Sequence, residues 1–311
     1  MSLKIVFMGT PDFAVPALRA LHSNNYNVMR VVTQPDRPKG RGRKPTPPPV
    51  KQAAVELGYG ILQPKTIKTD EFRELITALA PDVIIVVAFG QILPKYILDI
   101  PVYGCINIHA SLLPRYRGAA PIQWALIQGE AETGVTTMFM DEGLDTGDII
   151  MSARLAIQPD DTSAMLHDRL ADLGADLLIQ TLKGLETGSL HPVAQDGSLA
   201  TYAPILKKQD GLIDWSKSAH ALESFIRGVT PWPGAFTFFN EKRLKIFKAR
   251  ALSQTGEPPP GTILKGFPDE LVVAAGKGVL SILELQSASG KRLAVRDFLR
   301  GHPFPPGTVL G

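Results

Sequence analysis

The sequence has very little cysteine and no long apolar run. Cys105 is the only cysteine in 311 residues, which excludes an internal disulfide framework and indicates a reducing compartment. No apolar stretch approaches the roughly 18 residues that a membrane-spanning helix requires. The opening residues MSLKIVFMGTPDF predict a short strand and a turn, without the apolar core of a signal peptide. We therefore expect a cytoplasmic protein that binds no membrane.

Common cofactor and metal signatures are also missing. The turn GTPDFA, residues 9–14, stands where a dinucleotide-binding protein would carry G-x-G-x-x-G, which argues against a nicotinamide or flavin cofactor. The six histidines are scattered and show no metal-ligand spacing, so we expect no metal ion. Cys105 lies in an apolar segment and is expected to be a small buried side chain rather than a nucleophile.

The charge is small overall but unevenly distributed. The net charge is +3, yet residues 207–311 contain 15 Lys and Arg against 9 Asp and Glu. Residues 36–44, DRPKGRGRK, hold five basic residues and one acidic residue. Two basic features on a mildly acidic body favour a polyanionic partner. The alternative is that both are ordinary solvated surfaces.

The first two thirds of the chain alternate between predicted strands and helices. We expect strands over residues 3–9, 27–33, 82–88, 105–109 and 134–140, and helices over residues 14–23, 50–57, 70–79 and 162–185. This alternation is typical of a doubly wound, Rossmann-like α/β domain with a parallel sheet, which we place at residues 1–189. Residues 34–50 form a long loop rich in Pro, Gly and basic residues, and such loops are usually functional or disordered.

The remainder of the chain predicts a second domain. Residues 190–206 have no sustained periodicity and are expected to be a linker. A helix over residues 216–227 ends before PWPG, and five short strands follow at residues 235–239, 244–251, 261–264, 271–275 and 279–285. Five short strands with Gly-rich turns favour a small OB-fold-like β-barrel over residues 207–311.

The stretch GCINIHASLLPRYRG, residues 104–118, carries the clearest functional signal. Because side chains alternate along a strand, Asn107 and His109 share one face while Ile106 and Ile108 share the other. Ligands bind at the carboxyl ends of strands in open α/β sheets. The loops at residues 89–93 and 141–147 are expected at the same edge. The alternative for an isolated Asn-x-His is a strand end with a solvated histidine.

Several motifs together carry a family resemblance. They are GTPDFA (9–14), TQPDRPKGRGRK (33–44), GCINIHASLLPRYRGAAPIQWA (104–125), ETGVTTMFMDEGLDTGDI (132–149), IDWSKSA (213–219) and PWPGA (231–235). Through them the chain resembles, nearly end to end, the methionyl-tRNA formyltransferases within the folate-dependent formyltransferase family. The resemblance implies transfer of the formyl group of 10-formyltetrahydrofolate to the methionine of initiator Met-tRNA, the step that prepares it for translation initiation.

The resemblance also implies a set of site residues. Asn107, His109 and Asp145 match the catalytic trio of the family. Ser111, Leu112, Leu113 and Pro114 match its folate-binding turn. Because the loops at residues 89–93 and 141–147 are expected beside this turn, we also expect folate contacts at Phe89, Gln91, Ile92 and Asp141. The expected tRNA-binding residues are Arg37, Lys39, Arg41, Arg43 and Lys44 in the basic loop, and Lys207, Lys208, Lys242, Arg243, Lys245, Lys248 and Arg250 in the second domain. This basic loop, called the basic arm below, is expected to stay unfolded until it binds RNA.

The same trio can be argued from chemistry. Attack of an amine on a formyl carbon creates an oxyanion, and one preorganised donor such as the Asn107 amide is worth roughly 3–4 kcal/mol. Proton transfer requires a group that titrates near neutrality, which His109 supplies, and Asp145 can hydrogen-bond the imidazolium. Asp148 competes with Asp145 for this role, although a loop or capping role is its simpler explanation. Glu142 is expected to be solvated, and Ser111 lacks a nucleophile elbow.

Two other functions remain open at this point. A formyltransferase acting on a sugar nucleotide or a purine precursor would keep residues 104–147 but would not need the basic loop. A non-catalytic RNA-binding protein would use the barrel alone and would give no reason for Asn107, His109 and Asp145 to converge. We expect a monomer whose partners are initiator Met-tRNA and folate.

Overall fold

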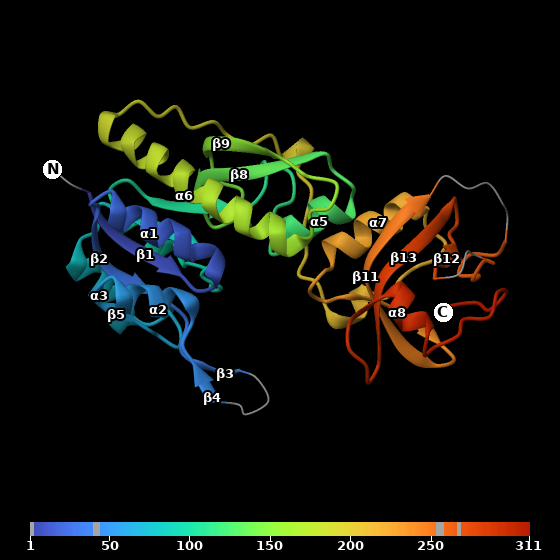
Figure 1. Cartoon of the computed structure of the whole chain (residues 1–311). Helices are drawn as coiled ribbons and strands as arrows, with labels where there is room; N and C mark the ends of the chain where they lie inside the picture. Colours follow the sequence, from blue (N-terminus) through green and yellow to red (C-terminus); the bar gives the residue numbers. More distant parts are fainter. Residues whose placement is uncertain (1–2, 40–43, 253–257, 266–268) are drawn as a thin grey trace. The chain divides into compact units, whose positions relative to one another are not determined.

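The computed structural model describes residues 3–39, 44–252, 258–265 and 269–311 (Figure 1). Its contacts divide the chain into two compact units. The first unit comprises Met1–Gly118, Glu132–Ala156 and His167–Ala203, and the second comprises Ala119–Ala131, Ile157–Leu166 and Pro204–Gly311.

A seven-stranded sheet forms the centre of the first unit. In sheet order its strands are β5 (Ile61–Leu62), β2 (Asn27–Val32), β1 (Lys4–Gly9), β6 (Val83–Val87), β7 (Cys105–His109), β8 (Glu132–Phe139) and β9 (Ile149–Ala156). Neighbours from β5 to β7 are parallel, whereas β8 and β9 are antiparallel. The predicted α/β fold class is confirmed, with a mixed rather than wholly parallel sheet.

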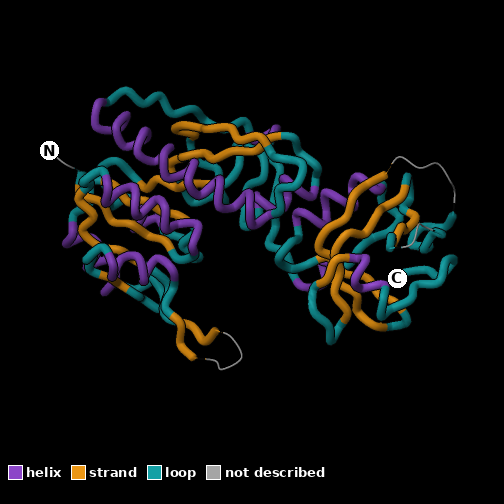
Figure 2. Tube along the Cα trace, viewed as in Figure 1, coloured by secondary structure: helices purple, strands orange, loops and turns teal. Residues whose placement is uncertain are grey.

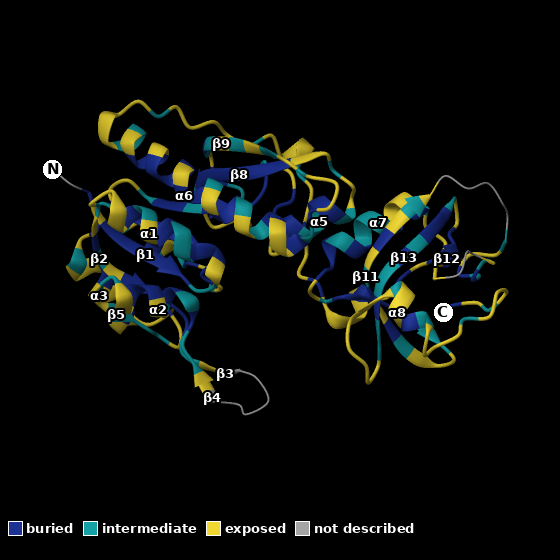
Figure 3. Ribbon diagram, in the orientation of Figure 1, coloured by how far each residue is buried: buried dark blue, intermediate teal, exposed yellow. Residues whose placement is uncertain are grey.

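Helices cover this sheet and bury its central strands. They are η1 (Asp12–Ala14), α1 (Val15–Ser23), α2 (Pro49–Glu56), α3 (Asp70–Leu79), α4 (Lys95–Leu98) and α6 (Ser163–Thr187). Strand β6, VIIVV, is buried at every position, as suits a β-branched strand with both faces covered. Its neighbour β1 is drawn largely in the dark blue of buried residues in Figure 3. A Cβ added to Gly174 of α6 would lie 2.9 Å from Ile108, so α6 packs directly on β7.

Helix α3 shows how local signals fix an element. The Thr69 side chain accepts a hydrogen bond from the Phe72 amide at 3.2 Å, and Asp70 and Glu71 occupy the positive first turn. The helix ends at Ala80, which adopts a left-handed conformation with φ 44°. Its predicted bounds, residues 70–79, are therefore confirmed.

The basic loop is more ordered at its flanks than predicted. Strands β3 (Arg37–Lys39) and β4 (Lys44–Thr46) pair as an antiparallel hairpin (Figure 2). The Lys51 ammonium lies 2.8 Å from both Asp36 oxygens, and hydrogen bonds from Gln63 and Lys51 lower the pKa of the Asp36 carboxyl. The expectation of an irregular loop is wrong at the flanks, while Arg41 and Arg43 lie outside the described residues.

The direction of β8 corrects the predicted geometry of the site. Because β8 is antiparallel to β7, its last residue Phe139 pairs with Ile106 rather than lying beside His109. The loop after β8 therefore leaves near the start of β7. The expectation that this loop emerges at the carboxyl edge of a parallel sheet is wrong, and Asp145 reaches His109 because the loop folds back.

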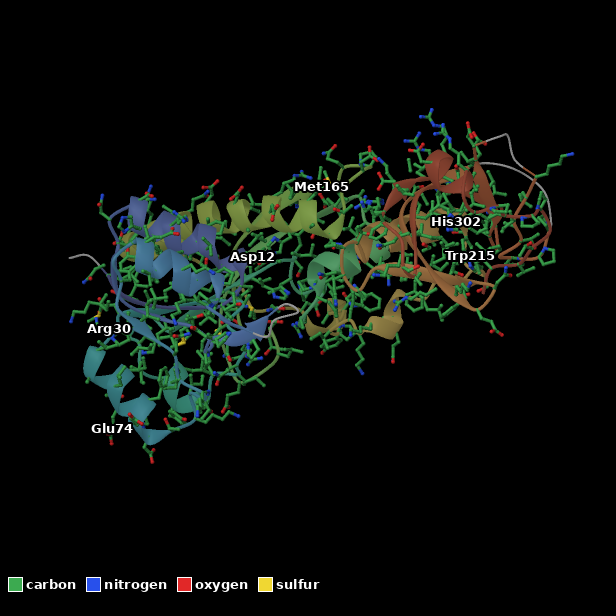
Figure 4. The ribbon with its side chains drawn as sticks, turned by 60° about the horizontal axis from the view of Figure 1, so that its bottom comes forward. Asp12, Arg30, Glu74, Met165, Trp215 and His302 are labelled. Carbon is green, nitrogen blue, oxygen red and sulfur yellow. The ribbon has the colours of Figure 1, made fainter. Side chains whose placement is uncertain are left out.

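The second unit is built on a curled antiparallel sheet. Its elements are α5 (Pro121–Ile127), η3 (Lys208–Gly211), α7 (Ala219–Gly228), β10 (Ala235–Phe239), β11 (Lys242–Leu252), β12 (Leu271–Ala274), β13 (Val279–Ser287), β14 (Leu293–Ala294) and α8 (Val295–Leu299). The sheet order is β10-β11-β13-β12, and β14 pairs with β13. Trp215, labelled in Figure 4, is buried in this unit and donates its indole N–H to Thr237 Oγ1 at 3.1 Å.

The fifth strand of this sheet differs from the prediction. The predicted strand at residues 261–264 makes only isolated bridges, from Thr262 to Val309 and from Ile263 to Val273. The fifth strand is instead β14, a two-residue strand followed at once by α8. A pair of residues is too short to give an alternating pattern, so this strand had no periodic signal.

The packing around Gly134 of β8 leaves no room for a side chain. A Cβ there would lie 2.1 Å from the Ala153 carbonyl oxygen and 2.5 Å from Leu112. We expect Gly134→Ala to reduce the free energy of unfolding by about 1–3 kcal/mol, because the backbone of β9 must move. Chemical denaturation measures this, with Gly197→Ala as the control, since a Cβ there meets nothing within 4 Å. Equal stability of the two variants would contradict the packing described here.

Candidate active site

The His109 imidazole is buried between two partners. Its side chain is 6% exposed, and Nε2 lies 2.9 Å from the Tyr116 carbonyl oxygen. Because a carbonyl can only accept, Nε2 carries a proton and donates it there. Nδ1 faces Asp145 Oδ2 at 3.7 Å. Nδ1 is therefore the ring nitrogen left to gain or lose a proton, and a carboxylate faces it.

Asp145 is held in an unusual backbone conformation. Its φ is 55°, in the left-handed region, which costs a non-glycine residue about 1–3 kcal/mol and persists only where the surroundings impose it. Its Oδ2 accepts a hydrogen bond from the Gly118 amide at 2.7 Å. The fold thus directs the carboxylate toward the His109 ring and fixes it to the loop that follows Tyr116.

Asn107 lies on the same face of β7 as His109, two residues away. It is half-buried and pairs across the sheet with Met138 of β8. Residues that pair directly across strands project on the same face. The amide of Asn107 and the imidazole of His109 therefore stand side by side on one surface.

The predicted folate turn is held by a buried threonine. Thr136 Oγ1 donates to the Ser111 carbonyl at 2.7 Å and accepts from the Leu113 amide at 3.2 Å. Ser111 Oγ donates to the Arg115 carbonyl at 2.6 Å. Leu113–Pro114 is a cis peptide bond. Ser111, Leu112, Leu113 and Pro114 form a tight turn directly after β7.

The acidic residues of the 141–148 loop have separate roles. Asp141 Oδ1 accepts hydrogen bonds from the Gly143 amide at 3.0 Å and the Thr146 hydroxyl at 2.7 Å, so it shapes the loop. Glu142 and Asp148 are exposed. Asp145 is the carboxylate that faces His109.

The segment after β6 combines core and surface residues. Phe89 is 2% exposed and belongs to the core, whereas Ile92 is 76% exposed. The side-chain oxygen Oε1 of Gln91 accepts from the Ile67 amide at 3.1 Å, and the buried side-chain nitrogen Nε2 has no partner among the described residues.

A cavity of about 510 Å³ opens beside this segment, at the ends of β1 and β6. It is lined by Thr10, Pro11, Asp12, Gln34, Pro35, Arg37, Pro38, Thr46, Pro47, Pro48, Pro49, Gln52, Ala88, Phe89 and Gly90. The buried side-chain nitrogen Nε2 of Gln34 has no hydrogen-bond partner among the described residues. The strand order reverses between β1 and β6, because β2 lies on one side of β1 and β6 lies on the other. Ligands of open α/β sheets usually bind at such a switch point.

The predicted basic residues differ in their surroundings. Lys207, Lys208, Lys242 and Lys245 are exposed, as is Arg250. Lys248 Nζ lies 3.3 Å from Asp160. The Arg243 guanidinium stacks 3.6 Å from the centre of the Phe236 ring. In the hairpin, Arg37 donates to Gln34 at 3.2 Å, and the backbones of Lys39 and Lys44 pair.

The part of the chain that the structure describes contains no reactive thiol, no metal site and no membrane-spanning helix. Burial, aided by Asp99, raises the pKa of the Cys105 thiol to about 12, so the thiol stays protonated at neutral pH. No group of three His, Cys, Asp or Glu side chains among the described residues is arranged to hold a metal ion. Within the same residues, no helix has both the length and the apolar composition to cross a bilayer.

Sequence reasoning missed three residues of the site. Thr136, Arg117 and Gln195 all make hydrogen bonds that hold its loops. Thr136 left no distinct signal, since its strand also carries Thr133 and Thr137. Gln195 left none, because it lies in the segment expected to be a linker and its partners are 48 to 78 residues away.

Both parts of the chain match known protein families. Residues 3–182 match the formyl transferase family and residues 205–303 match the formyl transferase C-terminal domain. The chain is 54% identical to the methionyl-tRNA formyltransferase of Citrifermentans bemidjiense, over 99% of this chain and 96% of that protein.

Solved structures share the fold. The sugar 3N-formyl transferase WlaRD, solved in the presence of dTDP and 5-N-formyl-THF, matches with a TM-score of 0.67 and 19% identity, over 94% of this chain and all of that chain. The methionyl-tRNA formyltransferase of Clostridium thermocellum matches with a TM-score of 0.55 and 20% identity, over 81% of this chain and 95% of that chain.

Thr136 provides a test of how the turn is held. Thr136→Val keeps the shape of the side chain but leaves the Ser111 carbonyl and the Leu113 amide without their partner. We expect a loss of about 1–3 kcal/mol in the free energy of unfolding, measured in urea. Ser152→Ala is the control, because it removes only the 3.3 Å contact that Thr136 makes with an exposed residue. A Thr136→Val protein as stable as the control would exclude this role.

Proposed function

Because the chain belongs to the formyl transferase family, we propose that it transfers the formyl group of 10-formyltetrahydrofolate to the α-amino group of methionine on initiator methionyl-tRNA. The observation that carries this proposal is the 54% identity to a methionyl-tRNA formyltransferase across nearly the whole chain, both units included. The product is N-formylmethionyl-tRNA for translation initiation. A tRNA substrate places the reaction in the cytoplasm, and we expect a monomeric enzyme.

The reaction needs a hydrogen-bond donor that stabilises the developing oxyanion, and we assign this role to Asn107. The amine attacks the formyl carbon, and the carbonyl oxygen takes up negative charge. The Asn107 amide lies beside His109 on one face of β7, where its N–H can stabilise that charge. When the tetrahedral intermediate collapses, the bond from carbon to the folate nitrogen breaks.

His109 and Asp145 are assigned to proton transfer. The attacking amine loses one proton and the departing folate nitrogen gains one, so the reaction is balanced without any other reactant. Since Nε2 of His109 is engaged by the Tyr116 carbonyl, we assign the transferred proton to Nδ1. Asp145 provides a negative partner for the imidazolium that exists while Nδ1 is protonated.

We propose that folate binds against residues 89–93, residues 111–114 and the 141–145 loop. The exposed Ile92 and the turn at Ser111 supply an apolar wall and backbone groups, the usual lining of a small-molecule site. The folate-bound structure of WlaRD supports a folate donor for this fold. Phe89 belongs to the core below this segment, and Asp141 holds the loop through Thr146.

The cavity beside Gln34 is suited to the second substrate. Its lining joins the ends of β1 and β6 to Arg37 and Thr46 of the hairpin. A basic hairpin that contacts phosphates would bring the end of a tRNA to this cavity. Its proline-rich walls suit an apolar side chain, and the buried Gln34 amide suits an oxygen acceptor.

His109 tests the proposed chemistry. With charged initiator tRNA and 10-formyltetrahydrofolate, we expect the wild-type protein to form N-formylmethionine, and His109→Ala to lower kcat about 10²–10⁴-fold. Because the ring is buried, the variant also leaves a cavity and an unpaired Tyr116 carbonyl, so kcat is compared at a temperature where circular dichroism shows it to be folded. His191→Ala, at an exposed histidine, should retain full activity. An active His109→Ala protein would refute the mechanism.

The basic arm tests the proposed tRNA contact. Replacing Arg41 and Arg43 by Ala should raise the KM for tRNA or lower kcat, and leave folate binding intact. Each lost phosphate contact should also reduce the slope of log K against log salt by about 0.7–0.9. Lys68→Ala with Lys183→Ala, two exposed lysines outside the arm, controls for charge. Kinetics and salt slope like those of this control would leave the arm without a role.

A further inference from the structure

The Gln195 side chain connects the two loops that hold His109. Its Nε2 donates to the Asp145 carbonyl at 2.9 Å and to the Gly147 carbonyl at 2.7 Å. Its Oε1 accepts from Arg117 Nε at 3.1 Å and from an Arg117 terminal nitrogen at 2.7 Å. Every donor and both lone pairs of one amide are thereby used. The orientation of the amide is unambiguous, because arginine can only donate and carbonyls can only accept.

These contacts lie next to the groups that bind the imidazole. Arg117 stands between Tyr116, whose carbonyl accepts from His109, and Gly118, whose amide binds the Asp145 carboxylate. Asp145 therefore has its carboxylate fixed by Gly118 and its own carbonyl fixed by Gln195. Two fixed points on one residue over-determine the left-handed conformation that aims Oδ2 at His109.

The segment that carries Gln195 is itself anchored. Val193 exchanges two 2.9 Å backbone hydrogen bonds with Ile149 of β9. Eight residues on, the Thr201 carbonyl accepts from the Arg117 amide at 2.8 Å, and the Ala203 amide donates to the Arg117 carbonyl at 2.7 Å. Gln195 is held between these two anchors and lies 3.9 Å from Met138 Sδ, on the face of the sheet that carries Asn107.

We propose that Gln195 is a positioning residue for the transfer reaction, which holds the Asp145 turn so that its carboxylate faces His109 Nδ1. This inference rests on the proposed function. Gln195 acts through Asp145 rather than on the substrate. Its loss should therefore lower kcat without changing the KM for either substrate.

Gln195→Glu separates positioning from simple stabilisation. A glutamate keeps the length of the side chain and gives Arg117 a bidentate carboxylate partner, so the segment stays anchored. The carbonyls of Asp145 and Gly147 lose their donor and face a negative charge. We expect kcat to fall about 10- to 100-fold at a temperature where the variant is folded, with both KM values unchanged.

Two further variants complete the experiment. Gln195→Met keeps the length of the side chain but makes none of these bonds, and should also lower kcat at a temperature where circular dichroism shows it to be folded. Gln158→Met, the same change at an exposed glutamine, should behave as the wild type. Wild-type kcat in Gln195→Glu overturns the inference, and so does a rise in the KM for either substrate that accompanies the fall in kcat.

Failure of the proposed function would be distinguishable from failure of this inference. If the wild-type protein forms no N-formylmethionine, the proposed function fails. The crystal structure of Gln195→Glu then tests positioning by itself, without any activity. A displaced Asp145 turn supports the inference, and an Asp145 carboxylate still facing His109 overturns it.

Discussion

The burial of the His109 imidazole is the constraint on which the first unit depends. A buried imidazole needs a partner at each nitrogen, because an unsatisfied polar group inside a protein is costly. The two partners come from residues in left-handed backbone conformations, Tyr116 with φ 60° and Asp145 with φ 55°. Both loops are bent unfavourably so that a carbonyl and a carboxylate meet one ring. Such strain persists only where other bonds hold it, which is the role of the contacts around Arg117.

The residues proposed as catalytic could be named from the sequence, whereas the residues that hold them could not. The period of two along β7 places Asn107 and His109 on one face without any tertiary information. Asp145 was found through its motif, but the supposed reason, a shared carboxyl edge, was wrong because β8 runs antiparallel. Strand direction depends on how the intervening chain packs, which no local pattern records. Gln195 is invisible for the same reason, since a glutamine in an aperiodic segment resembles any solvated residue.

The hairpin in the basic loop could not be predicted from the sequence because both of its strands contain proline. Proline lacks an amide donor and is normally excluded from strands that pair on both sides. In β3 and β4, Pro38 stands opposite Pro45, and each strand pairs only with the other. An antiparallel pair alternates between hydrogen-bonded and non-hydrogen-bonded positions, and the latter require no amide. Helix α3, by contrast, carried its cap and its charged first turn in the sequence, and its bounds followed.

The second unit shows why a basic composition does not by itself identify phosphate-binding residues. Lys248 is paired with Asp160, but both side chains are largely exposed, and such a pair contributes at most about 1 kcal/mol. A phosphate that releases counterions can therefore replace the aspartate. Arg243 is different, because its guanidinium lies against the Phe236 ring and its Nε is buried. Moving it to a phosphate would give up that stacking, so the exposed Lys242 and Lys245 on the same strand are better placed than Arg243 to hold RNA.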